Sequence, residues 1–102
     1  MGEKYHKLVR DKIPEMLDNM CVPYEKSIAM GEEYKKWLLL KLKEEFAEFQ
    51  EDESVEELAD LLEVIKALEK LPEYKNLEEV RVKKAGERGV FLEGIILKGE
   101  KK

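Results

Sequence analysis

The chain has 102 residues, a net charge of −5 at neutral pH and one cysteine, Cys21. We expect residues 1–102 to form one small domain, which buries only a modest core alone and therefore favours a homodimer or homotetramer. The acidic balance argues against a nucleic-acid partner, and a single cysteine excludes an intrachain disulfide framework. The longest apolar run, residues 37–40, is too short to cross a bilayer, so we expect a cytoplasmic protein without a membrane partner.

The first thirty residues predict an entry segment, a short helix and a connection. Residues 5–10 favour a short extended segment. Asp11 is expected to cap a helix that has Pro14 in its first turn and runs to about Met20. Residues 22–30 contain a proline and β-branched residues in alternation, which fits a short strand or an extended loop.

The rest of the chain predicts helices and one late strand. Residues 32–50 form a long amphipathic pattern, and a polar turn at 51–54 separates it from a second helix over 55–70. A third pattern covers residues 76–87, and residues 90–97 favour a short strand. The predicted fold is therefore mainly α, a helical bundle with a short C-terminal β element.

Helical projection places an acid on the face of residues 32–50 that should pack inward. At about 100° per residue, Glu45 lies in the middle of the apolar stripe. The stripe consists of Tyr34, Leu38, Leu42 and Phe49. Glu48 lies about 60° to one side of Glu45, and Glu44 about 100° away. A carboxylate at such a position is costly unless it is paired or binds a cation.

The second long helix repeats this arrangement. Glu57 lies in the middle of its apolar stripe, with Asp60 about 60° to one side. The stripe consists of Leu61, Val64, Leu68 and Leu71. Because the connection is short, we expect the two helices to be antiparallel neighbours whose acidic pairs face each other.

Four converging carboxylates, with Lys41 as the one basic residue near those faces, predict a site for a hard divalent cation. Oxygen ligands favour Mg²⁺, with Mn²⁺ as the alternative. The chain has no Cys/His cluster for zinc, and its only histidine, His6, lies outside both helices and is interpreted as a surface or packing residue. No phosphate-binding glycine loop is present either.

Other interpretations of these acids remain open. Glu57 could complete a capping box with Ser54, and the acids could pair with lysines elsewhere in the fold or across a dimer. The alternative to an enzyme is therefore a helical oligomerisation module that binds nucleotide or metal without turnover, or that is purely structural.

The acidic pattern resembles the signature of a known family. Glu44-Glu45-x-x-Glu48 followed by Glu57-x-x-Asp60 is similar to the motif of the MazG-like all-α NTP pyrophosphatases, which include dimeric dUTPases and phosphoribosyl-ATP pyrophosphohydrolase. The opening Lys-Leu-Val-Arg-Asp-Lys-Ile-Pro-Glu at 7–15 resembles the start of a small subfamily of house-cleaning pyrophosphatases, as do residues 57–65 and 88–91. The resemblance spans almost the whole chain.

The resemblance implies hydrolysis of a nucleoside triphosphate to the monophosphate and pyrophosphate. It implies Mg²⁺ ligation by four acids: Glu45, Glu48, Glu57 and Asp60. Glu44 matches the first acidic position, for which we expect a supporting contact or activation of the attacking water. Only residues 49–56 separate the two acidic motifs, whereas many members of the family have a longer connection, so the resemblance implies no particular base.

The basic residues suggest where the phosphates bind. Arg10 and Lys12 precede a predicted helix start, which suits a triphosphate, although they could instead pair with nearby acids such as Asp11 or Glu15. Lys84 and Arg88 are weaker candidates of the same kind. Trp37 at the edge of the inward stripe could stack on a base, although a core position is the simpler interpretation.

Overall fold

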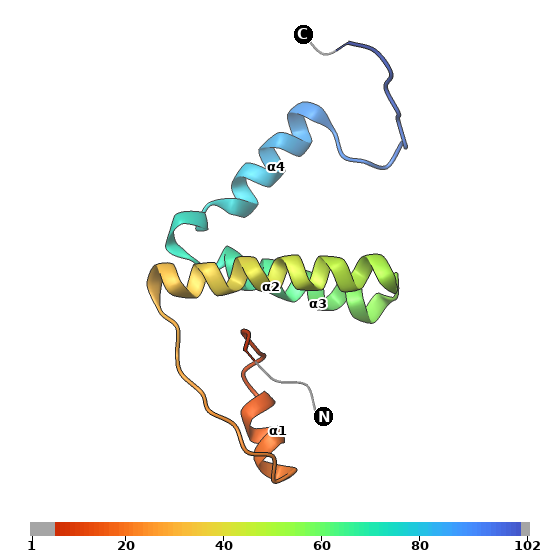
Figure 1. The fold of residues 1–102 in the computed structure, drawn as a ribbon. Helices are drawn as coiled ribbons and strands as arrows, with labels where there is room; N and C mark the ends of the chain where they lie inside the picture. The colour runs from red at the N-terminus through yellow and green to blue at the C-terminus, as the bar shows by residue number, and fades with distance from the viewer. Residues whose placement is uncertain (1–5, 101–102) are drawn as a thin grey trace. The chain divides into compact units, whose positions relative to one another are not determined.

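All regular secondary structure in the computed structural model, which describes residues 6–100, is helical (Figure 1). The elements are α1 (Ile13–Asn19), α2 (Gly31–Glu51), α3 (Val55–Glu69), the 3₁₀-helix η1 (Pro72–Tyr74) and α4 (Leu77–Arg88). The prediction of a mainly helical fold is confirmed. None of the helices over residues 6–100 is both long enough and apolar enough to span a membrane.

The chain divides into two compact units, Met1–Lys70 and Leu71–Lys102. The first unit contains α1, α2 and α3, and it carries all five acids singled out in the sequence. The second contains η1 and α4.

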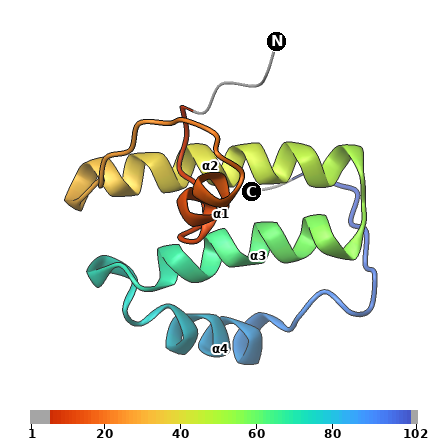
Figure 2. The same ribbon diagram turned by 90° about the horizontal axis from the view of Figure 1, so that it is seen from below.

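The first unit is organised around an antiparallel hairpin of α2 and α3, which lie side by side (Figure 2). Only three residues, 52–54, separate the helices, and Ser54 begins α3 because its Oγ accepts a hydrogen bond from the Glu57 N–H at 3.2 Å. Leu38 of α2 and Val64 of α3 are the buried apolar side chains of the described chain. Both belong to the stripes that projection places inward.

Helix α1 begins differently from the prediction. Its N-cap is Lys12, which makes no side-chain cap, so the expectation that Asp11 caps the helix is wrong. The reason is a turn just before the helix, in which the Ile13 N–H donates to the Arg10 carbonyl oxygen at 3.0 Å. After the helix, residues 22–30 form an extended connection without strand pairing, which is one of the two predicted alternatives.

In the second unit the predicted helix is present, as α4. It ends at Gly89, whose φ of +82° is a conformation that residues with a Cβ rarely adopt. The short strand predicted for residues 90–97 is not formed. A strand needs a neighbouring strand for its backbone hydrogen bonds, and no strand exists between residues 6 and 100 to supply one. Apolar side chains there, such as Phe91 and Ile96, are fully exposed.

Candidate metal centre

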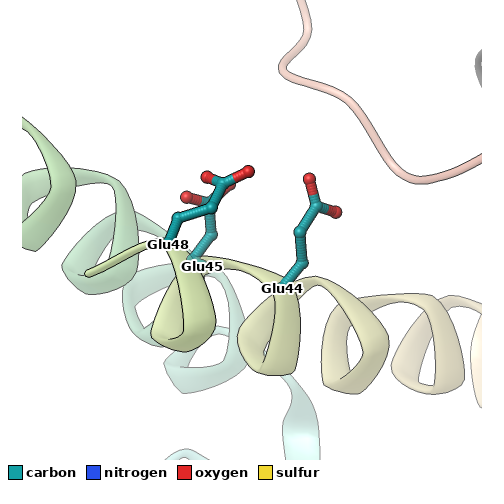
Figure 3. A group of neighbouring side chains, drawn as sticks. All are labelled: Glu44, Glu45 and Glu48. Atoms are coloured by element: carbon teal, nitrogen blue, oxygen red, sulfur yellow. The ribbon is translucent and has the colours of Figure 1, made fainter. Parts of the chain in front are cut away.

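Three acids of α2 project from one side of the helix. Glu44 and Glu45 are consecutive residues and Glu48 lies one turn further along the helix, and their carboxyl groups point the same way (Figure 3). Their ligand oxygens lie within 4.8 Å of one another, close enough to bind a single cation.

The antiparallel hairpin adds the acids of α3. Glu45, Glu57 and Asp60 form a second group that satisfies the same 4.8 Å limit, so Glu45 belongs to both groups. The structure therefore brings together the five acids that projection and resemblance single out. We call these residues, Glu44, Glu45, Glu48, Glu57 and Asp60, the carboxylate centre.

Two oxygens of the carboxylate centre are buried without a hydrogen-bond partner. Glu45 is only 6% exposed, and its Oε2 has no donor within residues 6–100. Oε2 of Glu57 is likewise buried and has no hydrogen-bond partner within these residues. An unsatisfied buried carboxylate oxygen costs about 1 kcal/mol or more, and both residues belong to one group of acids, so they indicate a missing positive partner.

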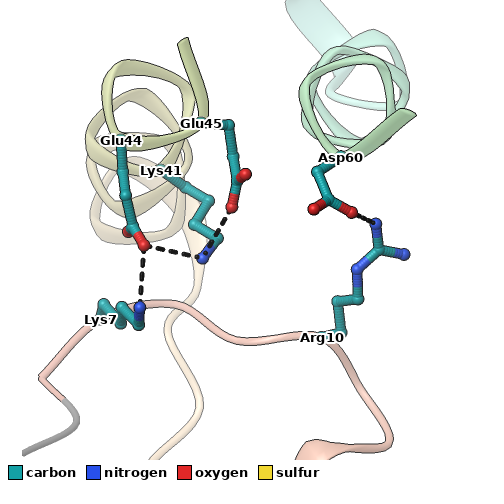
Figure 4. A network of polar contacts seen from close by, with 6 residues as sticks. All are labelled: Lys7, Arg10, Lys41, Glu44, Glu45 and Asp60. Atoms are coloured by element: carbon teal, nitrogen blue, oxygen red, sulfur yellow. Dashed lines mark hydrogen bonds and ion pairs between the residues drawn. The ribbon is translucent and has the colours of Figure 1, made fainter. Parts of the chain in front are cut away.

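Basic side chains satisfy part of the centre (Figure 4). Lys41 Nζ lies 3.1 Å from Glu45 Oε1 and 3.4 Å from Glu44 Oε1. Two further basic side chains come from residues 6–12, the segment before α1. Lys7 Nζ is 2.8 Å from Glu44 Oε1, and Arg10 Nη2 is 2.7 Å from Asp60 Oδ1. The sequence left open that the acids pair with basic residues. That pairing is present for Glu44, Glu45 and Asp60.

The pairing leaves the centre short of positive charge. Five carboxylates face three basic groups, and within the described chain neither Glu48 nor Glu57 has a basic partner. When all groups are ionised, two negative charges remain. A divalent cation carries the charge that would neutralise them.

Desolvation and the remaining repulsion both raise the pKa values of Glu48 and Glu57, the two acids without a basic partner within the described chain. Desolvation, and then the negative charge of Glu45 together with a hydrogen bond to it, raises the pKa of Glu48. Desolvation, and then the charges of Asp60 and Glu45, raises the pKa of Glu57. Both carboxyl groups therefore hold protons more tightly than an isolated glutamate does.

Glu44 behaves in the opposite way. Desolvation works to raise its pKa, but the hydrogen bond from Lys7 and the charges of Lys41 and Lys7 outweigh it, so the pKa of Glu44 lies below its ordinary value. Glu44 is therefore ionised at neutral pH, even though like charges surround it.

The capping-box interpretation of Glu57 is half correct. The Ser54 side chain accepts from the Glu57 N–H, but the Ser54 N–H donates to the Asp52 carbonyl oxygen at 2.7 Å. The return bond from the Glu57 carboxylate, which would complete the box, is absent from the described hydrogen bonds. Capping therefore explains the backbone of Glu57 and leaves its carboxylate available to the centre.

A cavity of about 570 Å³ is lined in part by Lys7 and Arg10, which pair with Glu44 and Asp60, whereas none of the five acids of the carboxylate centre lines it. Its lining also includes Tyr34 and Trp37 of α2. Trp37 is half-buried, and its ring centroid lies 5.5 Å from that of His6 in a tilted arrangement. Trp37 is therefore a cavity wall, which is compatible with stacking on a flat ligand.

The basic residues proposed from sequence separate into three cases. Arg10 reaches the carboxylate centre, whereas Lys12 is exposed at the start of α1 and has no ion pair to the centre within residues 6–100. Lys84 and Arg88 lie on α4 in the second unit, so their substrate role stays a prediction. Sequence reasoning missed Lys7 as a site residue, although its position three residues before Arg10 was the available signal.

Comparisons with protein-family models, with curated proteins and with solved structures found no match to this chain. The functional assignment consequently depends on the residues of the carboxylate centre and on the motif resemblance.

Proposed function

We propose that this protein is a Mg²⁺-dependent nucleoside triphosphate pyrophosphohydrolase of the MazG-like all-α type, able to use Mn²⁺. The observation that carries the proposal is Glu45, whose buried Oε2 has no hydrogen-bond partner within residues 6–100 and which is the acid common to both carboxylate groups. A buried carboxylate is stable among other acids when a bound cation neutralises its charge.

The donor set fits this metal. Every ligand atom is a carboxylate oxygen, the donor that Mg²⁺ and Mn²⁺ prefer, and no sulfur or imidazole belongs to either group. Glu45, Glu48, Glu57 and Asp60 are the residues that would hold the ion. When bound, Mg²⁺ neutralises charge on phosphate oxygens and increases the acidity of bound water.

The remaining parts of the site have complementary tasks. Glu44 is ionised at neutral pH and can accept the proton of the water that attacks the α-phosphorus. The P–O bond to the β-phosphate then breaks, and pyrophosphate leaves. Lys7 and Arg10 are placed to neutralise the phosphates, and the cavity along Tyr34 and Trp37 has room for the nucleoside. House-cleaning of noncanonical nucleotides is the role that the resemblance suggests.

The assay that tests this proposal measures pyrophosphate release from a panel of canonical and modified triphosphates, with Mg²⁺ or with EDTA. We expect release of pyrophosphate and the nucleoside monophosphate in Mg²⁺ alone. Release of orthophosphate and a diphosphate would place cleavage at another bond and contradict the proposal.

A second copy of the chain is the proposed partner of the hairpin. On α3 an additional apolar stripe is exposed at i, i+4 and i+7 spacing, and α2 leaves further large apolar side chains uncovered. These residues are Leu58, Leu62 and Ile65 on α3, and Leu39, Leu40 and Phe46 on α2. Two copies would bury one another's stripes, as expected for a homo-oligomer with a shared core.

Light scattering coupled to gel filtration tests this association. We expect a dimer or tetramer for the wild-type chain. Leu62→Glu should shift the mass toward the monomer, because a charge in an apolar interface is unfavourable. Glu63→Gln, an exposed neighbour outside this stripe, is the matched control and should leave the mass unchanged. A monomeric wild-type protein would contradict the proposed association.

The ion pairs already formed within the centre favour one other candidate, a helical oligomerisation module that binds metal or nucleotide without turnover. Lys41, Lys7 and Arg10 each neutralise an acid without any ligand. For the purely structural form of this candidate, Mg²⁺ would leave the melting temperature unchanged. For the binding form, nucleotide would raise the melting temperature with no release of pyrophosphate.

A further inference from the structure

The segment before α1 contacts both acidic helices at once. Lys7 pairs with Glu44 on α2, and Arg10, three residues later, pairs with Asp60 on α3 (Figure 4). The two contacts span 37 and 50 positions of the chain. One short segment thus places two positive charges on two walls of the carboxylate centre.

These cations occupy acids that belong to the two ligand groups. Glu44 is in one group and Asp60 in the other. A carboxylate that already pairs with an ammonium or guanidinium group binds a metal less well, because the metal must replace that partner. Arg10 therefore competes with a divalent cation for Asp60, and Lys7 neutralises Glu44, whose negative charge would otherwise help to attract the cation.

The two residues are also able to leave. The side chain of Arg10 is 56% exposed and that of Lys7 is 39% exposed, so neither is locked by packing. Lys41 differs, because it is 16% exposed and lies on α2 one turn before Glu45. Exposed pairs of this kind are individually weak, about 0.2–1 kcal/mol each, which makes exchange for a divalent cation feasible.

We infer that Lys7 and Arg10 are internal counter-cations: they hold the carboxylate centre in the metal-free protein, yield it to the divalent cation, and then bind the phosphates of the incoming triphosphate. This inference depends on the proposed function and adds a role for two named residues. The two side chains thus pair with the acids in the metal-free protein and with the phosphates after the substrate binds. Their positions on the cavity lining bring them to the space where the substrate would lie.

The test uses Lys7→Gln/Arg10→Gln with Lys36→Gln as the control. Lys36 is an exposed residue of α2 with the same charge, it does not line the cavity, and no ion pair joins it to the centre within the described chain. Calorimetry measures the affinity for Mg²⁺ alone. A second titration, in Mg²⁺, measures a triphosphate whose α–β bridging oxygen is replaced by a methylene group. Circular dichroism verifies folding of each variant.

The expected result is a pair of opposite changes. The double variant should bind Mg²⁺ about fivefold more tightly, since it no longer competes for the acids, and the triphosphate analogue about tenfold more weakly. Lys36→Gln should change each affinity by less than about twofold. Weakening of both affinities, as a merely structural role predicts, or no change in either, would overturn the inference.

Trp37 supplies an independent readout that needs no turnover. It is the only tryptophan of the chain, and its ring contacts His6, the neighbour of Lys7. Release of Lys7 by Mg²⁺ should therefore change the Trp37 emission of the wild type and have little effect on the double variant. An emission that Mg²⁺ leaves unchanged in the wild type would argue against release.

The outcomes separate this inference from the proposed function. If the wild type neither binds Mg²⁺ nor releases pyrophosphate, the proposed function fails. If it does both, and the double variant changes neither affinity, only the role of Lys7 and Arg10 is wrong.

Discussion

Replacing Glu45 by glutamine should abolish Mg²⁺-dependent pyrophosphate release, with a loss of at least about 10³-fold in kcat/KM. Glu45 is the one acid shared by both ligand groups, and glutamine keeps its size while removing its charge. Loss of the ion removes several kcal/mol of transition-state stabilisation, and each 1.4 kcal/mol or so corresponds to a factor of about ten. Steady-state kinetics with the best triphosphate of the panel measures the effect.

The stability of this variant separates a functional from a structural role. Because Glu45 contributes to the excess negative charge of the centre, its neutral form should leave the metal-free protein at least as stable as the wild type. Glu63→Gln removes an exposed charge on α3 and should keep full activity. A Glu45→Gln protein that is strongly destabilised in EDTA, with Mg²⁺ having no effect on the wild type, would indicate that Glu45 serves mainly to pair with Lys41.

The metal-free protein should lose stability as the pH rises from about 4.5, and saturating Mg²⁺ should reverse this loss. The pKa values of Glu48 and Glu57 in the folded protein are raised above their ordinary value of 4.5. In that window the folded state binds more protons than the unfolded state, so raising the pH favours unfolding. Glu44, whose pKa is lowered, contributes stability above its ordinary pKa and loses it only as the pH falls below 4.5.

Thermal melts between pH 4.5 and 7.5, in EDTA and in Mg²⁺, measure this effect. At Mg²⁺ concentrations about 100 times Kd, binding adds about 2.7 kcal/mol, which corresponds to a rise of about 10 °C or more for a domain of this size. Glu48→Gln/Glu57→Gln should flatten the pH dependence in EDTA and remove the response to Mg²⁺. A metal-free protein whose stability rises steadily over this range would contradict the assigned pKa directions.

The helices and the convergence of acids could be predicted because they depend on local periodicity. Glu45 and Glu57 each interrupt an apolar stripe, and a short turn between two helices forces those stripes to face each other. The start of α1 depends instead on one backbone hydrogen bond to Arg10, which competes with capping by Asp11 and leaves no mark in the residue pattern.

Two other features depend on information that lies outside the local sequence. Residues 90–97 have side chains that favour a strand. A strand requires a neighbouring strand, however, and residues 6–100 contain none. Lys7 contacts Glu44, which lies 37 positions later in the chain. This contact exists because the segment before α1 lies against the α2–α3 hairpin. Neither composition nor helical projection reports such long-range placement.

The central claim is that the carboxylate centre binds a divalent cation through Glu45. The most direct measurement is a crystal structure of the protein grown with Mn²⁺, whose anomalous scattering locates the ion without assumptions about the chemistry. We predict an anomalous peak within bonding distance of Oε2 of Glu45 and of the carboxylates of Glu57 and Asp60, with Arg10 displaced from Asp60. A centre without an anomalous peak, in which Lys41, Lys7 and Arg10 keep their contacts with the acids, would contradict the claim.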